Sequence, residues 1–76
     1  MGVEEYLAAH ENQMGLCMIC KKPPTRNRLS ADHCHDTMKP RALLCDNCNL
    51  GLGSFMDNIH ILESAIEYLR LHNGMS

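Results

Sequence analysis

Four of the five cysteines in this 76-residue chain form two Cys-x-x-Cys pairs, which constrain the fold more than any other feature. Two intervening residues let both sulfurs of a pair reach one ion at about 2.3 Å, and four thiolates fill the tetrahedral sphere of a structural zinc site. The 24 residues between the pairs exceed the usual ~15–20 and leave room for a hairpin. We therefore expect one structural zinc ion, held by Cys17, Cys20, Cys45 and Cys48.

A zinc staple also suits the size of the chain. A core this small rarely supplies more than about 3–5 kcal/mol, and the sequence has no Trp and a single Phe. The first residues, MGVEEYLAAH, lack the apolar segment of a secretory signal, and no apolar run approaches the ~20 residues that span a bilayer. We expect an intracellular, cytoplasmic protein, in which thiols stay reduced and paired cysteines favour a metal over disulfides.

A rival zinc site would combine Cys17 and Cys20 with His33 and His35, as in a two-Cys two-His finger. Such fingers place three to five residues between their histidines, and here a single residue separates them. The rival would also leave the second cysteine pair without a role. The four-cysteine site is therefore the preferred interpretation.

The charges are divided unevenly along the chain. The net charge is −2, but residues 21–41 carry six basic and two acidic side chains, a local charge of +4, and the remaining residues carry −6. This asymmetry suits a protein with one side facing a polyanion, because each phosphate that it neutralises releases counterions. A solvated basic loop would give the same pattern, so charge alone leaves nucleic acid as one of two interpretations.

Turn residues and short apolar runs predict a hairpin between the two cysteine pairs. Its strands are expected over residues 28–35 and 41–45, around a turn at 36–40. The Pro-Pro segment at 23–24 excludes a helix from the loop that precedes the hairpin.

Three helices are expected around this hairpin, because apolar residues recur at helical spacing before it and after it. Their predicted limits are residues 3–14 with Gly15 as the end, a start near Cys45, and a cap at Asp57 or Asn58 with Gly74 as the stop. The apolar face of the third helix consists of Ile59, Leu62, Ala65, Ile66 and Leu69. The whole chain, 1–76, is thus predicted to be a single small α+β domain with flanking N- and C-terminal helices.

Asp32, His33 and Asn49 combine the residue types that phosphodiester hydrolysis requires. Asp32 and Asn49 offer oxygen ligands suited to Mg²⁺ or Mn²⁺, which keep positions open for water and substrate. A histidine that titrates near neutrality is the usual general base. Neighbouring residues of a regular strand point to opposite faces, so Asp32 and His33 can serve one phosphate only where the backbone bends. A polar hairpin tip with solvated histidines is the alternative that the residues leave open.

Three motifs follow one another in a specific order: CMIC at 17–20, SADHCH at 30–35 and RALLCDNCNLGLG at 41–53. Together they resemble the recombination endonuclease VII branch of the HNH superfamily, over about residues 12–69. The resemblance includes Gln13 and Gly15 before the first cysteine pair. It implies a zinc-stapled ββα-metal (HNH, His-Me finger) domain.

The resemblance also implies a DNA endonuclease and assigns roles to its residues. Asp32 and Asn49 would bind the catalytic Mg²⁺ or Mn²⁺, and His33 would activate water. His35 would take the place of the family's second active-site histidine, and the products would carry a 5′-phosphate and a 3′-hydroxyl. The expected contacts to DNA are Arg41, which matches the family's arginine, and Lys39, Arg28 and Arg26. A phage origin, with action in a bacterial host, is expected from the family.

Two positions depart from the family's pattern. Cys34 stands where Asp is usual, and Ala42 stands where Gly is common. Neither is a core catalytic position. Cys34 is expected to be a plain small residue, and the alternative is a free thiol that oxidises or competes for zinc. Family members that resolve four-way junctions carry a further C-terminal region, so branched DNA is one expected substrate but junction specificity is not carried over.

Two other functional classes remain open from the sequence. The chain could be a non-catalytic zinc module that binds DNA or a protein partner, or a nuclease subunit that needs a partner. For the nuclease, a homodimer through the apolar faces of the first and third helices is expected, because two cuts in a duplex are easiest with two sites.

Overall fold

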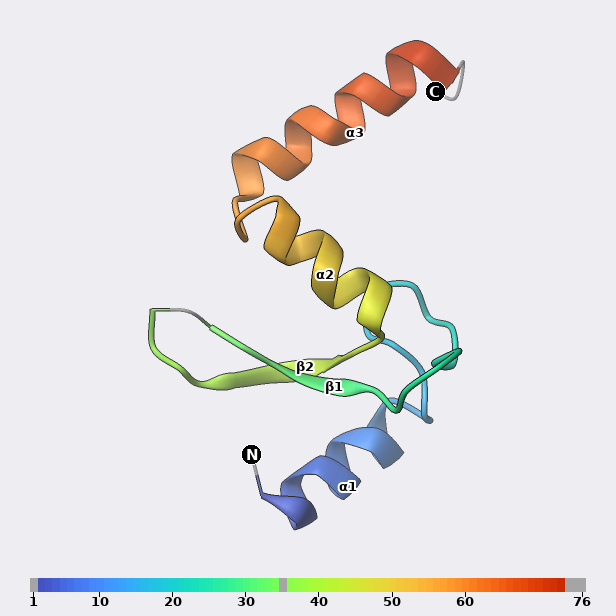
Figure 1. Cartoon of the computed structure of the whole chain (residues 1–76), viewed down its shortest axis with the longest axis vertical. Coiled ribbons are helices and arrows are strands. Elements are labelled where there is room, and N and C mark those ends of the chain that lie inside the picture. Colours follow the sequence, from blue (N-terminus) through green and yellow to red (C-terminus); the bar gives the residue numbers. More distant parts are fainter. Residues whose placement is uncertain (1, 35, 74–76) are drawn as a thin grey trace.

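A two-stranded hairpin forms the centre of the computed structural model, which describes residues 2–34 and 36–73. Strand β1 (Ser30–His33) pairs antiparallel with β2 (Pro40–Leu44). The helices are α1 (Val3–Asn12), α2 (Asp46–Ser54) and α3 (Ile59–Asn73). Figure 1 shows α1 and α2 on opposite sides of the hairpin, with α3 leading away from it. The described residues therefore form the small α+β architecture that the sequence predicts.

The pairing of the two strands is irregular at Asp32. Ala31 lies opposite Leu43 but His33 lies opposite Pro40, so three residue steps along β2 match two along β1. The extra residue lies on β2, where Arg41 and Ala42 stand opposite Asp32; it makes a β-bulge, which bends β2 and increases the local twist of the hairpin. The pairing of the two strands therefore departs from regular geometry opposite Asp32, next to His33.

The core is small and lies where α1, the hairpin and the cysteine pairs meet. The buried hydrophobic residues of the described chain are Cys17, Leu29, Leu43 and Leu44. Partly buried residues of α1 and α2, among them Tyr6, Ala9 and Leu52, pack against this cluster. Because so little apolar surface is buried, the fold depends on polar contacts and on the cysteine cluster beside the core.

Side-chain hydrogen bonds attach α1 to the hairpin. The Tyr6 hydroxyl donates to the main-chain oxygen of Leu29 at 2.5 Å. The Gln13 amide pairs with both main-chain groups of Leu43, donating from Nε2 to the oxygen at 3.0 Å and accepting from the N–H at 2.9 Å. Gln13 thus makes the two hydrogen bonds that a neighbouring strand would make, and it covers the edge of β2 at Leu43.

Helix α1 ends two residues before its predicted limit. The Met14 N–H bonds to the Glu11 oxygen at 3.0 Å and the Gly15 N–H bonds to the His10 oxygen at 2.9 Å. This pair of bonds is a Schellman motif, in which the residue after the cap adopts a left-handed conformation. That residue is Met14, with φ 57°. Gly15, one position farther along the chain, contributes the second of the two hydrogen bonds.

Helix α2 ends in the same way. The Met56 N–H bonds to the Gly53 oxygen and the Asp57 N–H bonds to the Leu52 oxygen, both at 2.9 Å. Met56 and Asp57 have φ values of 56° and 55°, so two consecutive residues other than glycine are left-handed. This tight turn separates α2 from α3.

Asn58 is the residue that caps α3. Its Oδ1 accepts a hydrogen bond from the N–H of Ile61 at 3.0 Å, as expected of an N-cap side chain. Of the two predicted caps, Asp57 is therefore not used in this way. The predicted stop, Gly74, lies outside the described residues.

Helix α3 extends away from the rest of the molecule (Figure 1). Ile59, Ile66 and Leu69 on its apolar face are 70%, 47% and 53% exposed. The radius of gyration is 14.1 Å, against about 11 Å for a compact domain of this length. None of the helices in the described part of the chain is both long and apolar enough to cross a bilayer.

Candidate functional site

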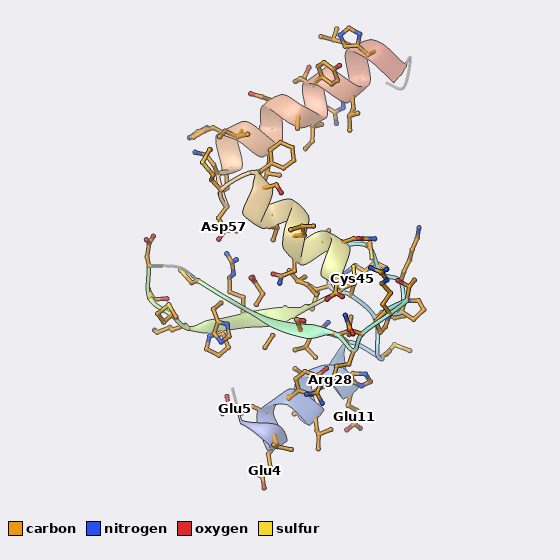
Figure 2. The ribbon with its side chains drawn as sticks, in the orientation of Figure 1. Glu4, Glu5, Glu11, Arg28, Cys45 and Asp57 are labelled. Atoms are coloured by element: carbon orange, nitrogen blue, oxygen red, sulfur yellow. The ribbon has the colours of Figure 1, made fainter. Side chains whose placement is uncertain are left out.

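The four paired cysteines converge at the start of α2. Cys17 and Cys20 come from the turn after α1, Cys45 is the N-cap residue of α2 (Figure 2), and Cys48 lies in the first turn of that helix. Their sulfurs all lie within 4.8 Å of one another, and those of Cys20 and Cys45 are 3.8 Å apart. Four sulfurs at about 2.3 Å from one ion are about 3.8 Å apart, so this set could hold zinc.

The rival set of two cysteines and two histidines is not what the structure brings together. His33 is outside the cysteine cluster, and His35 lies outside the described residues. The cluster thus consists of the four cysteines that the sequence spacing predicts.

Two thiols of the cluster differ in how readily they ionise. Burial raises the pKa of the Cys17 thiol, but hydrogen bonds from the main chain at Cys45, Cys20 and Ile19 outweigh it and bring the pKa to about 6. Burial, followed by hydrogen bonds to the other cysteines, raises the pKa of Cys48 to about 12. The Cys17 thiol therefore ionises readily and the Cys48 thiol resists ionisation, and a bound cation would favour the thiolate of Cys48.

Main-chain bonds hold the first cysteine pair against the hairpin. The Cys17 N–H bonds to the Lys22 oxygen and the Lys21 N–H bonds to the Cys17 oxygen, both at 3.0 Å. The Met18 N–H bonds to the Leu43 oxygen of β2 at 3.1 Å. The turn that carries Cys17 and Cys20 is therefore fixed relative to the strand that leads into Cys45.

Asn49 follows directly after Cys48, so the cysteine cluster also fixes its position. Its N–H bonds to the Cys45 oxygen at 3.0 Å, in the first turn of α2. Because Cys45 follows the last residue of β2, the same cluster joins the end of the hairpin to the start of this helix.

Asp32, His33 and Asn49 line one open cavity of about 350 Å³, together with Ala31, Met38 and Gly53. Asp32 and His33 come from β1 opposite the bulge, and Asn49 comes from α2. The Asp32 side chain is 12% exposed, whereas Asn49 is exposed. Three of the four predicted catalytic residues are thus brought together, and the fourth, His35, lies outside the described residues.

Arg41 contacts two carboxylates beside this cavity. Its Nε–H donates to Oδ2 of Asp32 at 2.5 Å, and its Nη2 lies 3.0 Å from Oδ2 of Asp57. The hydrogen bond to Asp32 is the main cause that raises the pKa of Arg41 above its ordinary value. The guanidinium, expected from the sequence to contact phosphate, therefore faces Asp32 and Asp57 and is 39% exposed.

The other basic residues expected to contact DNA are spread over the molecule. Arg26 lines a second cavity of about 350 Å³ beside Cys20 and Cys45. Arg28 lies over the Tyr6 ring, with Cζ 5.8 Å from the ring centroid. Lys39 is exposed in the hairpin turn, where its N–H contacts Thr37 Oγ1 at 3.3 Å.

Asp57 is the residue at this site that the sequence analysis missed. Figure 2 shows its side chain reaching from the turn between α2 and α3 toward the hairpin. It lies 16 positions from its partner Arg41, in another element. No local pattern links residues so far apart, so the sequence suggested only a helix cap.

The sequence matches a known protein family. The sequence model of recombination endonuclease VII matches residues 1–71. The chain belongs to the recombination endonuclease VII family. The region that matches this endonuclease VII model contains both cysteine pairs, the whole hairpin, α2 and most of α3.

Two phage proteins are similar to this endonuclease VII family member. It is 49% identical over 69 residues to the Gene 59 protein of Mycobacterium phage D29 and 44% identical over 68 residues to the Gene 59 protein of Mycobacterium phage L5. These alignments cover 88% and 87% of the chain but 42% of each relative, so the chain spans less than half the length of these relatives. The name Gene 59 protein describes no activity. No solved structure matches the chain significantly.

Proposed function

We propose that this member of the endonuclease VII family is a metal-dependent endonuclease that hydrolyses phosphodiester bonds in DNA. The observation that carries the proposal is the shared cavity of Asp32, His33 and Asn49 beside the four-cysteine cluster. Two oxygen ligands and one histidine are the groups that hydrolysis assisted by a hard cation needs. The family's name supports the same class of reaction.

Each residue of the cavity has a distinct role in this proposal. Asp32 and Asn49 hold Mg²⁺ or Mn²⁺, which when bound supplies positive charge at the phosphate and at the leaving oxygen. His33 accepts the proton of the attacking water, and His35 assists at the phosphate or the leaving group. The products then carry a 5′-phosphate and a 3′-hydroxyl.

In this assignment β1, β2 and α2 form the ββα-metal unit of an HNH nuclease. The supporting observation is the order of the elements, a hairpin followed at once by the helix that carries Asn49. Zinc in the cysteine cluster acts structurally, because it joins the strand end to that helix and so sets the separation of Asp32 and Asn49. The flanking helices α1 and α3 take no part in the chemistry.

The proposed substrate is DNA, including branched DNA. Residues 21–41 carry six of the seven Lys and Arg side chains of the chain. The proposed phosphate contacts are Arg26, Arg28, Lys39 and Arg41. The relatives are phage proteins, which supports action on DNA inside an infected bacterium. A second copy of the chain is the proposed partner, with α3 as the contact.

Relaxation of supercoiled plasmid by zinc-loaded protein tests the proposal, with and without Mg²⁺ or Mn²⁺. Cleavage should require the added cation, and the His33→Ala variant should cleave about 10²–10⁴-fold more slowly. His60→Ala is the matched control, because His60 is 94% exposed and lies on α3, away from the cavity. Ligation of the nicked product without prior phosphorylation would identify the 5′-phosphate and 3′-hydroxyl.

The alternative is a zinc module that binds DNA or a protein without cutting. Failure of the zinc-loaded wild type to cleave either plasmid or branched DNA would overturn the proposal of an enzyme active alone. DNA binding without cleavage would then favour the binding module. Cleavage restored by a lysate fraction of the host would favour a subunit that needs a partner.

A further inference from the structure

The Arg41 guanidinium joins the candidate cation ligand to a carboxylate from a different part of the fold. Its Nε–H donates to Oδ2 of Asp32 at 2.5 Å and its Nη2 lies 3.0 Å from Oδ2 of Asp57. Asp32 belongs to β1, Arg41 to β2 and Asp57 to the turn after α2. One side chain thus connects both strands of the hairpin to the end of the helix that carries Asn49.

The backbone around Asp57 is held in a costly conformation. Met56 and Asp57 are both left-handed, a conformation that is unfavourable for most residues other than glycine, although Asp tolerates it better than most. The hydrogen bond from the Asp57 N–H to the Leu52 oxygen fixes this turn on α2. Position 57 is therefore fixed relative to Asn49, although the two residues come from opposite ends of α2.

The contact with Asp57 determines which atoms of Arg41 bind Asp32. A guanidinium with a single carboxylate partner usually forms a bidentate pair that occupies both oxygens. Here Asp57 takes Nη2, and Nε serves Oδ2 of Asp32.

We propose that Asp57 is a positioning residue of the cation site: by holding Arg41 it orients Asp32 and keeps one Asp32 oxygen available to the cation. The part of this inference that concerns the cation rests on the proposed function. The part that concerns Arg41 does not, since it is argued from the two ion pairs themselves.

The first test is titration of the zinc-loaded protein with Mn²⁺ alone. Electron paramagnetic resonance measures the concentration of free Mn²⁺ at each step. Asp57→Asn should weaken Mn²⁺ binding about 10-fold, the size of effect that outer partners of metal ligands have. The Asn side chain keeps the volume and tolerates the left-handed backbone, so the variant should fold; zinc content and Tm verify this. Asp36→Asn is the matched control. Exposed Asp36 lines a neighbouring cavity of about 490 Å³ together with Arg41 and Asp57, but it is not a partner of Arg41 in either ion pair.

A second pair of variants separates positioning from simple loss of charge. If Asp57 acts through Arg41, Asp57→Asn should change Mn²⁺ affinity by less than about twofold when Arg41 is already Gln. An equal loss in both backgrounds, or an equal loss in Asp36→Asn, would overturn the proposal, because either result means that Asp57 acts only by its charge.

The side chain of Arg41 gives a readout that needs neither cation nor cleavage. In the ¹⁵N spectrum, the Nε–H of a guanidinium held by two carboxylates should be protected from exchange, and Asp57→Asn should broaden or shift it. An unchanged Arg41 signal in Asp57→Asn would overturn the positioning role. Absence of Mn²⁺ binding by the wild type, with the Arg41 signal sensitive to Asp57, would count against the proposed cation site alone.

Discussion

At the scale of single residues, Cys34 stands apart from the other four cysteines. It follows β1 in the hairpin turn, outside the metal cluster. A hydrogen bond with the Thr37 side chain is the main cause that lowers its pKa below the ordinary value. A lower pKa gives a larger fraction of thiolate at neutral pH, and the thiolate is the form that reacts with alkylating agents.

We therefore expect iodoacetamide to add once to the zinc-loaded protein at neutral pH, at Cys34. After removal of the metal by a chelator in denaturant, all five cysteines should react. Intact-mass spectrometry counts the adducts, and Cys34→Ser should show none while the metal is bound. Rapid addition of several groups to the native protein would contradict zinc coordination by the other four thiols.

Gln13 contributes more to the fold than its place at the end of α1 suggests. Its Oε1 accepts the N–H of fully buried Leu43 at 2.9 Å, and a buried N–H without a partner costs about 1–3 kcal/mol. Gln13→Ala should therefore lower the free energy of unfolding by about that amount, measured by denaturant titration of the zinc-loaded protein. Asn12→Ala, at the exposed neighbouring position, should change it by less than about 0.5 kcal/mol. Equal stability of the two variants would refute this role.

The sequence and the structure agree on the positions of residues that depend on short spacing. The two-residue gaps of the cysteine pairs led directly to the metal cluster, and adjacency to Cys48 brought Asn49 to the start of α2. Two features were not predictable in this way. The bulge opposite Asp32 depends on the register of two strands, and the Arg41–Asp57 contact depends on how α2 packs over the hairpin.

At the scale of elements, the types of helices and strands were predicted correctly, but several limits were not. The predicted strand over 28–35 shortens to Ser30–His33, and α1 ends at Asn12 instead of residue 14. The difference at α1 has a definite cause. The sequence predicts that Gly15 ends the helix, but Met14 is the residue after the cap that adopts the left-handed conformation. Hydrogen bonding in the last turn, rather than the glycine itself, sets the limit.

Two glycines in these helical regions should respond in opposite ways to alanine. Gly51 lies inside α2, and a Cβ there meets nothing within 4 Å, so Gly51→Ala should raise the free energy of unfolding by about 0.5–1 kcal/mol. Gly15 has φ 71°, and a Cβ there would lie 3.2 Å from Cε1 of His10. Gly15→Ala should therefore lower it by about 1–2 kcal/mol.

Thermal unfolding of the zinc-loaded variants measures both effects under identical conditions. The Tm of Gly51→Ala should lie above that of the wild type and the Tm of Gly15→Ala below it. A decrease for Gly51→Ala would mean that α2 packs more tightly at this position than the structure describes.

At the scale of the whole molecule, α1 and α3 differ in how much of their apolar faces is exposed to solvent. Tyr6 and Ala9 of α1 pack against the core, so the inner face of α1 is used within the chain. The apolar face of α3 remains open, although its residues are the kind that proteins bury. Of the two helices expected to form a dimer, α1 therefore uses part of its apolar face within the chain, although its Val3 and Leu7 are 76% and 59% exposed, whereas α3 leaves most of its face open.

The spacing along α3 indicates how two copies would meet. Ile59, Leu62, Ile66 and Leu69 follow one another at intervals of three, four and three residues, the a and d positions of a heptad. Isoleucine at a and leucine at d favour parallel two-stranded coiled coils. Two such copies would cover this face and place two candidate sites in one assembly.

Ile66→Asp tests this arrangement, because it places a charge at the centre of the apolar face. In sedimentation experiments over a range of concentrations, the wild type should form dimers, and the variant should need at least ~10-fold higher concentrations, equivalent to about 1.4 kcal/mol. Ser64→Asp is the matched control, since Ser64 is exposed and occupies the outermost heptad position. Similar dissociation of both variants would indicate an effect of charge alone, and a monomeric wild type at all concentrations would exclude a dimer through α3. Because the cavity residues lie on the hairpin and α2, the zinc content and Mn²⁺ affinity of Ile66→Asp should match those of the wild type in either case.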